Sequence, residues 1–349
     1  MRTRCSIACI IPPVLLEELA RRAGAEERDA LLRTLSLDAS LRLARVHNSL
    51  TAARHTRATI RQSATAGLPQ RTIFDCHGLE PPSDPEQVRA EGDPPTGDVT
   101  VNEAYDGLGD TYAFFWDRFK RDSIDDQGMP LHGWVHYGFE YDNAFWDGEQ
   151  MVFGDGKMFD RFTKSLDVIG HELTHGVTEH EAGLQYLNQS GALNESVSDV
   201  FGSLVKQYKL GQAADQADWL IGADLVKPGF PGEALRSMVE PGTAWDGDNQ
   251  PAHMDGYVQT MSDNGGVHIN SGIPNKAFAE LSLALGGPAW ETAGRIWYET
   301  LRDPQVRTNA TFREFAGRTV AAARQLYGAG STEVNAVEAC WDGVGVSAL

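Results

Sequence analysis

The chain has 349 residues, of which 41% are hydrophobic, and its 49 acidic and 30 basic side chains give a net charge of −19. This length allows two or three domains with a sizeable core, and no apolar run is long enough to span a bilayer. Because phosphate binding depends on Lys and Arg, the charge argues against nucleic acid as a partner of the main body. We expect neither a nucleic-acid nor a membrane partner.

The charge is unevenly placed along the chain. Residues 1–62 carry eleven Arg and no Lys against six acidic residues, a net of +5, whereas the remainder has a net of −24. Opposite signs favour docking of the first part on the remainder. A solvated basic face on a helical segment explains the same pattern, so both interpretations stay open.

Residues 14–50 are rich in Leu, Ala, Arg and Glu, with leucines at helical spacing. They predict helices that Gly24 and the stretch SLDAS (36–40) divide into two or three. Residues 51–70 are small, polar and basic, which is typical of a linker, and we call residues 1–70 the leader. The start of the leader lacks the long apolar region of a secretory signal. We therefore expect a cytoplasmic precursor, exported if at all by a non-classical route, with an extracellular location as the alternative.

Beyond the leader the pattern changes from strands to helices. Residues 80–98 carry five prolines and predict a loop. Residues 130–156 alternate aromatic and polar residues between turn signals, as a β-meander does. After residue 160 helical periodicity continues to the end. We therefore expect an α+β fold, with a helical leader followed by a β-rich half and an α-rich half.

The motif HELTH, residues 171–175, lies where the β-rich half meets the α-rich half. On a helix His171 and His175 lie one turn apart on the same face, so both imidazoles can bind one ion. Zinc suits imidazole nitrogen, and a catalytic zinc keeps three protein ligands and one open position. Glu172 is placed to reach a metal-bound water. A third ligand is needed from elsewhere in the chain.

Two schemes supply the third ligand in proteins with this motif. A histidine six residues after His175 is excluded, because that position is Glu181. A glutamate on a later helix fits, because Glu195 follows after 19 intervening residues in the stretch NESVSD. Asp199, on the same helix face, can accept the outer N–H of a ligating histidine. The alternative for both acids is an ordinary solvent-facing helix surface.

HELTH, the 19-residue gap and NESVSD resemble the thermolysin-like zinc endopeptidases. The resemblance extends from RTIFD (71–75) to DGVGV near the C-terminus and includes DNAFWDGEQMVFGDG, LRSM and DNGGVHINSGIPNKAF. It implies a two-lobed catalytic unit: a β-rich lobe over 71–180 that ends in the HELTH helix, and an α-helical lobe over 181–349. The zinc site lies on helices at the junction. It also implies peptide-bond hydrolysis, with Glu172 as the general base and then the general acid.

The resemblance assigns further catalytic roles. His268 and Tyr186 match the donors to the transition state, and Asp263 matches the acid that orients His268 and keeps it protonated. Asp199 and Asn194 match residues that surround the zinc ligands. A lone histidine is more often structural, which is the alternative for His268.

The resemblance also implies how a substrate binds. Asn143 and Ala144 match an edge strand that hydrogen-bonds the peptide, a common recognition mode. Arg236 matches the guanidinium that holds a substrate carbonyl beyond the cut. Five apolar residues match the pocket after the scissile bond: Phe159, Phe162, Val168, Leu225 and Leu235. The alternative for each residue taken alone is an ordinary place in the hydrophobic core. Together they predict cleavage on the N-terminal side of Leu, Phe, Ile or Val.

Members of the family often bind a pair of calcium ions after the third-ligand helix. Asp167 and Asp218 match two of these ligands, but Lys206, Leu220 and Ala223 stand where acids are expected. A lysine ammonium cannot bind calcium, and it can neutralise Asp167 instead. We therefore expect one catalytic zinc ion and no double calcium site, with calcium bound elsewhere as the open alternative.

The leader resembles the short precursor type of protealysin, through its length and the stretch CIIPPVLLEEL (9–19). This implies a latent precursor whose leader docks on the acidic enzyme, blocks the cleft as an intramolecular inhibitor and is cut off within about 51–71. The four cysteines show no CxxC spacing, so free thiols are expected. A thiol of Cys5 or Cys9 on the zinc is the less favoured alternative.

Two other functions remain as alternatives. The first is a non-catalytic or weakly active protein-binding member of the same fold. Loss of Glu172, His268 or a zinc ligand would favour this alternative, but all of these residues are present. A zinc aminopeptidase also combines HExxH with a distant glutamate. It usually has 18 intervening residues and a site for a free α-amine, for which the sequence has no motif.

Overall fold

The computed structural model describes residues 8–52, 66–80 and 85–348. The chain divides into two compact units: the first contains the residues up to Gly176 together with Asp224–Pro228, and the second contains Val177–Ala223 and the residues from Gly229 on. The first unit is built on a sheet and the second on helices, which confirms the predicted α+β class. None of the helices in the described ranges combines the length and apolarity that a membrane span requires.

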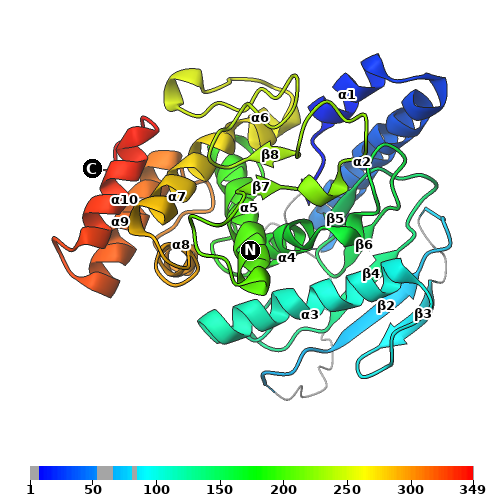
Figure 1. Ribbon diagram of the computed structural model, residues 1–349, viewed down its shortest axis with the longest axis horizontal. Helices are drawn as coiled ribbons and strands as arrows, with labels where there is room; N and C mark the ends of the chain where they lie inside the picture. Colours follow the sequence, from blue (N-terminus) through cyan, green and yellow to red (C-terminus); the bar gives the residue numbers. More distant parts are fainter. Residues whose placement is uncertain (1–7, 53–65, 81–84, 349) are drawn as a thin grey trace. The chain divides into compact units, whose positions relative to one another are not determined.

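The first unit contains a six-stranded sheet in the order β1-β5-β6-β4-β2-β3. Figure 1 labels strands β2 to β6 of this sheet. The strands are β1 Ala8–Cys9, β2 Arg71–Asp75, β3 Glu86–Ala90, β4 Leu131–Val135, β5 Ala144–Trp146 and β6 Met151–Phe153. Strand β4 runs parallel to both of its neighbours, β2 and β6, and the remaining pairs are antiparallel.

Two strand predictions are wrong in detail. The expected β-meander is only a β5–β6 hairpin, because the connection over 136–143 is a wide loop that carries the chain past β6, with left-handed backbone at His136 and Glu140. The region 80–98 is not all loop, because β3 lies within it and pairs with β2. The prolines flank this strand without interrupting it, so they remove no hydrogen bond from the ladder.

Helix α3, Val99–Phe119, packs on β2 and β4 (Figure 1). Its first turn is fixed by Asp98, whose side chain accepts a hydrogen bond from the Thr100 N–H at 2.8 Å. A short 3₁₀ turn, Phe162–Lys164, then leads to α4, Leu166–His180, which carries the HELTH motif. A Cβ on Gly176 would lie 2.6 Å from Ile124 and 3.0 Å from Trp146, so glycine permits the close approach of α4 to β5.

The described part of the leader is strand β1 followed by helices α1, Pro13–Arg22, and α2, Ala25–Ala52. The predicted division at Gly24 is correct, and the Arg28 side chain donates to the Ala20 carbonyl at 2.9 Å across this corner. The division at SLDAS is wrong, because these residues lie inside α2. There the Ser40 hydroxyl bonds the Ser36 carbonyl at 2.9 Å, which satisfies it without breaking the helix. Most of the predicted linker, together with Cys5, lies outside the described residues.

The second unit contains α5 Asn188–Leu210, α6 Asp263–Asn270, α7 Gly272–Leu285, α8 Ala293–Leu301, α9 Phe312–Tyr327 and α10 Thr332–Gly343. It also holds the antiparallel strand pair β7 Leu220–Ile221 and β8 Arg236–Ser237 and two short 3₁₀ turns, one at Met254–Gly256 and one that ends in the first unit, Ala223–Leu225. Trp297 of α8 stacks on Trp341 of α10 with ring centroids 5.9 Å apart, and Phe278 of α7 meets Trp297 edge-on at 5.1 Å. These rings form the core between the helices.

Candidate active site

Helix α4 brings the two predicted imidazole ligands together. The Nε2 atoms of His171 and His175 lie 3.0 Å apart, and both side chains are buried. Each of these residues and Glu172 offers a donor atom within 4.8 Å of the others, which makes this the one such cluster in the part of the chain that the structure describes. The i, i+4 spacing on a helix is what produces this convergence.

The arrangement fits a zinc ion. A tetrahedral ion with zinc–nitrogen bonds of about 2.0–2.1 Å sets two ligand nitrogens roughly 3.3 Å apart, close to the observed separation. Two buried imidazole nitrogens at this separation can both bind one cation. The donor set, two imidazoles and nearby carboxylate oxygen, also suits zinc better than the all-oxygen preference of calcium or magnesium.

Glu172 is held by the neighbouring strand β5. Its Oε2 atom accepts a hydrogen bond at 3.0 Å from the backbone N–H of Trp146, the last residue of β5. The carboxyl group is fully buried, and one of its oxygens lies within 4.8 Å of the donor atoms of the two histidines. One carboxylate oxygen is thereby fixed by the strand, and the orientation of the other follows from it.

The second unit holds a compact cluster of four polar side chains. The Tyr186 hydroxyl donates to Glu195 of α5, and it lies 3.1 Å from Nε2 of His268. His268 Nδ1 lies 2.6 Å from a carboxylate oxygen of Asp263, whose second oxygen accepts the His268 backbone N–H at 2.9 Å. Nε2 of His268 is 3.5 Å from Glu195. All of these residues are buried except Asp263, which is partly buried.

The turn that connects Asp263 to His268 depends on left-handed backbone. Asp263 and Asn264 have φ values of 52° and 50°, and Gly265 and Gly266 have 87° and 77°. A Cβ on Gly265 would lie 2.2 Å from the Asn188 side-chain oxygen, so only glycine fits there. The turn folds the Asp263 carboxylate back onto the imidazole five residues later.

The surroundings of His268 keep its imidazole protonated. Burial acts to lower its pKa, but the charges of Asp263 and Glu195 and the hydrogen bond to Asp263 outweigh burial and raise the pKa to about 9. The imidazole is therefore cationic near neutral pH, with Nδ1 directed at Asp263 and Nε2 directed at Tyr186 and Glu195.

Asp199, four residues after Glu195, forms a buried ion pair with Arg236 of β8. The Arg236 Nε and Nη2 atoms donate to its two oxygens at 2.9 and 2.8 Å, and Asn275 Nδ2 adds a third bond at 2.8 Å. Burial lowers the pKa of Arg236, but the Asp199 charge and hydrogen bonds prevail and raise it above its ordinary value. Asn194 lies on the same helix, and its side chain donates to the Leu184 carbonyl at 3.1 Å.

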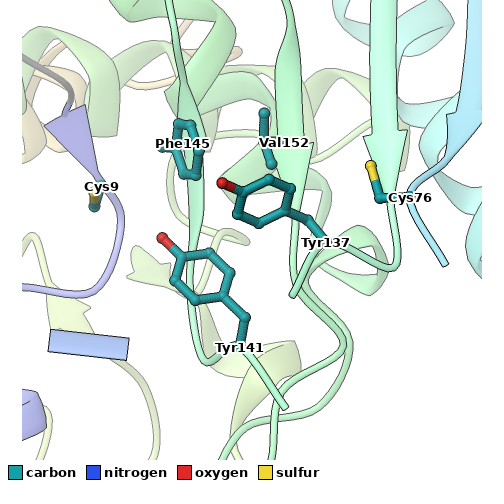
Figure 2. Close-up of a cluster of buried hydrophobic side chains, with 6 residues drawn as sticks. All are labelled: Cys9, Cys76, Tyr137, Tyr141, Phe145 and Val152. Atoms are coloured by element: carbon teal, nitrogen blue, oxygen red, sulfur yellow. The ribbon is translucent and has the colours of Figure 1, made fainter. Parts of the chain in front are cut away.

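The predicted substrate strand is covered by the leader. Strand β1 pairs antiparallel with β5, with Cys9 opposite Phe145, and the Ile10 N–H donates to the Ala144 carbonyl at 3.2 Å. The Ile11 N–H donates to the Asn143 side-chain oxygen at 3.0 Å. Cys9 is buried in an apolar cluster with Cys76, Tyr137, Tyr141, Phe145 and Val152, and is not part of the histidine cluster (Figure 2). The described cysteines, Cys9, Cys76 and Cys340, are free thiols, as predicted.

The predicted pocket residues are all buried, and four of them belong to the first unit: Phe159, Phe162, Val168 and Leu225. The rings of Phe159 and Phe162 meet edge-on at 6.1 Å, and a β-bridge joins Phe159 to the residue after Leu225. The fifth, Leu235, belongs to the second unit, where it packs on Gly222.

The lysine at the expected calcium position has an acidic partner. Lys206 Nζ lies 2.8 and 3.2 Å from the two carboxylate oxygens of Asp218 and 3.5 Å from the Leu220 carbonyl oxygen. Asp167, in the first unit, accepts a hydrogen bond from the Ser165 hydroxyl at 2.5 Å. The ammonium group therefore binds one of the two predicted calcium ligands.

Sequence reasoning missed several residues that the structure shows at these sites. The backbone N–H of Trp146 binds Glu172, Asn275 binds Asp199, and Asp38 and Tyr141 join the leader to the substrate strand. The motif around Asn275 contained a usable signal, since a buried asparagine needs polar partners. Asp38 carried none, because its partners lie more than 100 residues away.

Comparisons with known proteins agree with the geometry. Residues 92–179 match the family described as "Thermolysin metallopeptidase, catalytic domain", and residues 182–346 match "Thermolysin metallopeptidase, alpha-helical domain". The chain is 50% identical over 348 residues to an extracellular metalloprotease of Pectobacterium carotovorum subsp. carotovorum, covering 97% of this chain and 96% of that protein. It is 48% identical to protease PrtS of Photorhabdus sp. (strain Az29), covering 91% and 87%. Among solved structures it resembles the precursor of protealysin, a metalloproteinase from Serratia proteamaculans, with a TM-score of 0.86, 49% identity and coverage of 97% and 100%.

Proposed function

The chain belongs to the thermolysin family of metallopeptidases, and we propose that it is a zinc-dependent endopeptidase made as a self-inhibited precursor. The observation that carries the proposal is the convergence of the donor atoms of His171, His175 and Glu172, all within 4.8 Å of one another on α4. A structural helix has no need for two buried imidazole nitrogens 3.0 Å apart next to a buried carboxylate.

His171 and His175 would hold the zinc ion, with Glu195 as the third ligand. Zinc, when bound, lowers the pKa of a bound water and polarises the scissile carbonyl. Glu195 is supported by its burial and by its place 19 intervening residues after His175. Asp199 and Asn194, on the same helix as Glu195, would help to hold the zinc-binding side chains in position.

Glu172 is the group that moves the proton. Its Oε2 atom is fixed by the Trp146 N–H, so the carboxylate keeps one orientation while it takes a proton from water and later passes it to the leaving nitrogen. His268 and Tyr186 would donate hydrogen bonds to the oxyanion of the tetrahedral intermediate. Asp263 supports this role by holding His268 at 2.6 Å in its cationic form.

The substrate would bind as an added strand along β5. The Asn143 side chain and the Ala144 carbonyl would take its backbone groups, as they take those of Ile10 and Ile11 in the precursor. Arg236 would hold a substrate carbonyl beyond the cut. An apolar pocket formed by Phe159, Phe162, Val168, Leu225 and Leu235 would select Leu, Phe, Ile or Val after the scissile bond.

The leader would act as the intramolecular inhibitor, because it occupies the strand that a substrate needs. We expect the leader over 1–70 to be removed by a cut within about 51–71, leaving lobes over 71–180 and 181–349. Since relatives are named extracellular metalloproteases, the mature enzyme would act outside the cell on peptides and proteins.

The test is proteolysis of an unstructured protein by the purified, processed protein, with and without the chelator 1,10-phenanthroline. We expect internal fragments that begin with Leu, Phe, Ile or Val, and none with chelator. Release of single amino acids from the N-terminus would point to an aminopeptidase, and intact substrate in both samples would refute the proposal. The Glu172→Ala precursor should stay uncut if maturation is autocatalytic, and normal maturation of this purified variant would argue against self-processing.

A further inference from the structure

One face of the leader helix α2 binds three consecutive residues at the entry to the substrate strand. The Tyr141 hydroxyl donates to Asp38 Oδ1 at 2.5 Å, and the Asn143 side-chain nitrogen donates to Asp38 Oδ2 at 2.9 Å. Between them, the backbone N–H of Asp142 donates to the Thr34 hydroxyl at 3.1 Å. Thr34 and Asp38 are four apart and therefore lie on the same side of the helix.

These contacts are fully buried. Asp38 and Asn143 are 0% exposed and Thr34 and Tyr141 are 1% exposed, and an Arg42 guanidinium nitrogen lies 4.0 Å from an Asp38 carboxylate oxygen. A buried carboxylate is stable only if its oxygens receive hydrogen bonds. Tyr141 and Asn143 supply one donor to each oxygen, so they form a built site for a carboxylate.

The same site disables the side chain that a substrate would use. The Asn143 amide oxygen accepts the Ile11 N–H at 3.0 Å, and its nitrogen donates both to Asp38 and, at 3.3 Å, to the Ile11 carbonyl. The oxygen also accepts the Ala144 N–H at 3.0 Å. An amide has two donor hydrogens and two acceptor sites, and here all four are in use.

The apolar surroundings explain why this contact is strong. Tyr141 packs edge-on against Tyr137 and Phe145, with ring centroids 5.6 and 6.2 Å away, and Cys9 of the leader completes the cluster (Figure 2). Leu37 and Leu41 of α2 pack against the same cluster. These side chains keep water from the Asp38 carboxylate, and hydrogen bonds to a charged group gain strength where the local dielectric is low.

We propose that Tyr141 and Asn143 form a carboxylate-binding site, and that Asp38 fills it in the precursor as the latch that keeps the leader on the substrate strand. The inference rests on the proposed role of Asn143 in substrate binding. In the described residues β1 pairs with β5 at Ala8 and Cys9, and Asp38 adds a contact from helix α2 to the residues that lead into the same strand.

Asp38→Asn tests the latch with little change in size. The oxygen of the new amide can accept a hydrogen bond from either Tyr141 or Asn143, but its NH₂ group then faces the second of these donors. One hydrogen bond is therefore lost, and one buried donor is left unpaired. Arg33→Gln is the matched control on the same helix. It removes an ion pair with Glu140 at 3.0 Å whose arginine is half exposed, and such pairs contribute little.

The first measurement is amide hydrogen exchange of Ile10 and Ile11 in full-length precursors that also carry Glu172→Gln, which prevents self-cleavage. We expect exchange to rise about 10- to 100-fold in Asp38→Asn, the factor expected for a lost hydrogen bond to a buried charge, and less than about 3-fold in Arg33→Gln. Equal exchange in the two variants would overturn the proposal. In the Tyr141→Phe background, Asp38→Asn should add clearly less than it does alone, and full additivity would also overturn it.

The second measurement is the initial rate of peptide hydrolysis by each uncut precursor with Glu172 intact, divided by the rate of its own mature enzyme. We expect this ratio to rise about 10-fold or more for Asp38→Asn and to stay unchanged for Arg33→Gln. Mature enzymes from the wild type and from Asp38→Asn should be identical, because Asp38 leaves with the leader. If the mature enzyme were inactive, the proposed function would be refuted. The hydrogen-exchange measurement would still test whether Asp38 holds the leader on the substrate strand.

Discussion

Replacing Arg236 should destabilise the second unit far more than breaking an exposed ion pair of the same type. Arg236 is 2% exposed and Asp199 is 0% exposed, and the pair shares two hydrogen bonds at 2.8 and 2.9 Å. Arg236→Met keeps most of the side-chain volume but leaves the Asp199 carboxylate buried with Asn275 as its partner in this network. Removing one partner of a buried pair costs roughly 3–5 kcal/mol.

The control is Arg324→Met on the same unit. Arg324 of α9 pairs with Glu338 of α10 at 2.7 Å, but the two side chains are 47% and 28% exposed. Solvent screening limits such a pair to about 1 kcal/mol or less. The two substitutions remove the same chemical group at similar distances, so they differ chiefly in the burial of the carboxylate that is left behind.

The assay is thermal and urea unfolding followed by circular dichroism, with all proteins carrying Glu172→Gln to prevent autolysis. At roughly 2–4 °C per kcal/mol, Arg236→Met should lower Tm by about 6–20 °C and Arg324→Met by less than about 4 °C. Equal shifts, or a loss below about 1 kcal/mol for Arg236→Met, would show that Asp199 is compensated by other groups and that the reasoning from burial is wrong.

Three further outcomes are expected. His136 Nδ1 lies 2.9 Å from an Asp155 carboxylate oxygen, and His136 Nε2 lies 2.9 Å from an Asp98 carboxylate oxygen. The hydrogen bond to Asp155 raises the pKa of His136, burial lowers it, and the hydrogen bond to Asp98 raises it further, so that the pKa is about 9. Because the folded pKa lies above the ordinary 6.5, this stabilisation is complete below pH 6.5 and is lost as pH rises through about 9. Wild type should therefore lose up to about 1 kcal/mol more than His136→Asn between these pH values in urea titrations, given that both acids are part-exposed. Parallel pH profiles would contradict this. Millimolar calcium should leave Tm unchanged within about 1 °C, because Lys206 binds Asp218, and a large calcium-dependent rise would show that a calcium site persists. Removal of zinc by 1,10-phenanthroline should abolish hydrolysis, and added zinc should restore it, whereas activity that survives complete metal removal would exclude the metal mechanism.

The sequence was most informative where local periodicity decides structure. The leader helices, the strand-to-helix order and the HELTH helix all follow from residue spacing within single elements, and the structure has them. Strand pairing does not follow in this way, because partners are chosen across long separations. The parallel pairing of β4 with β2 and β6 is an example, and the short strand β3 between prolines is another.

In the candidate site, too, contacts within one helix could be predicted from the sequence, whereas contacts between distant residues could not. His171, Glu172 and His175 lie within five residues, so helix geometry alone brings their donor atoms together. The Asp38 contact with Asn143 joins residues 105 apart, and no spacing rule indicates it. Inside α2 the stretch SLDAS looked like a helix break, since Ser and Asp favour turns, but the buried partners of Asp38 outweigh that preference.

The pairing of β1 with β5 has a consequence for the life of the molecule after its leader has gone. In the precursor β1 caps the margin of the six-stranded sheet beside β5, and Cys9 covers aromatic side chains there. If the leader is removed as proposed, unpaired backbone groups next to Tyr137, Tyr141 and Phe145 would be uncovered, the kind of open strand that recruits other chains and leads to aggregation. A bound substrate strand would cover the same groups, so the processed enzyme should aggregate more slowly in the presence of substrate than in its absence.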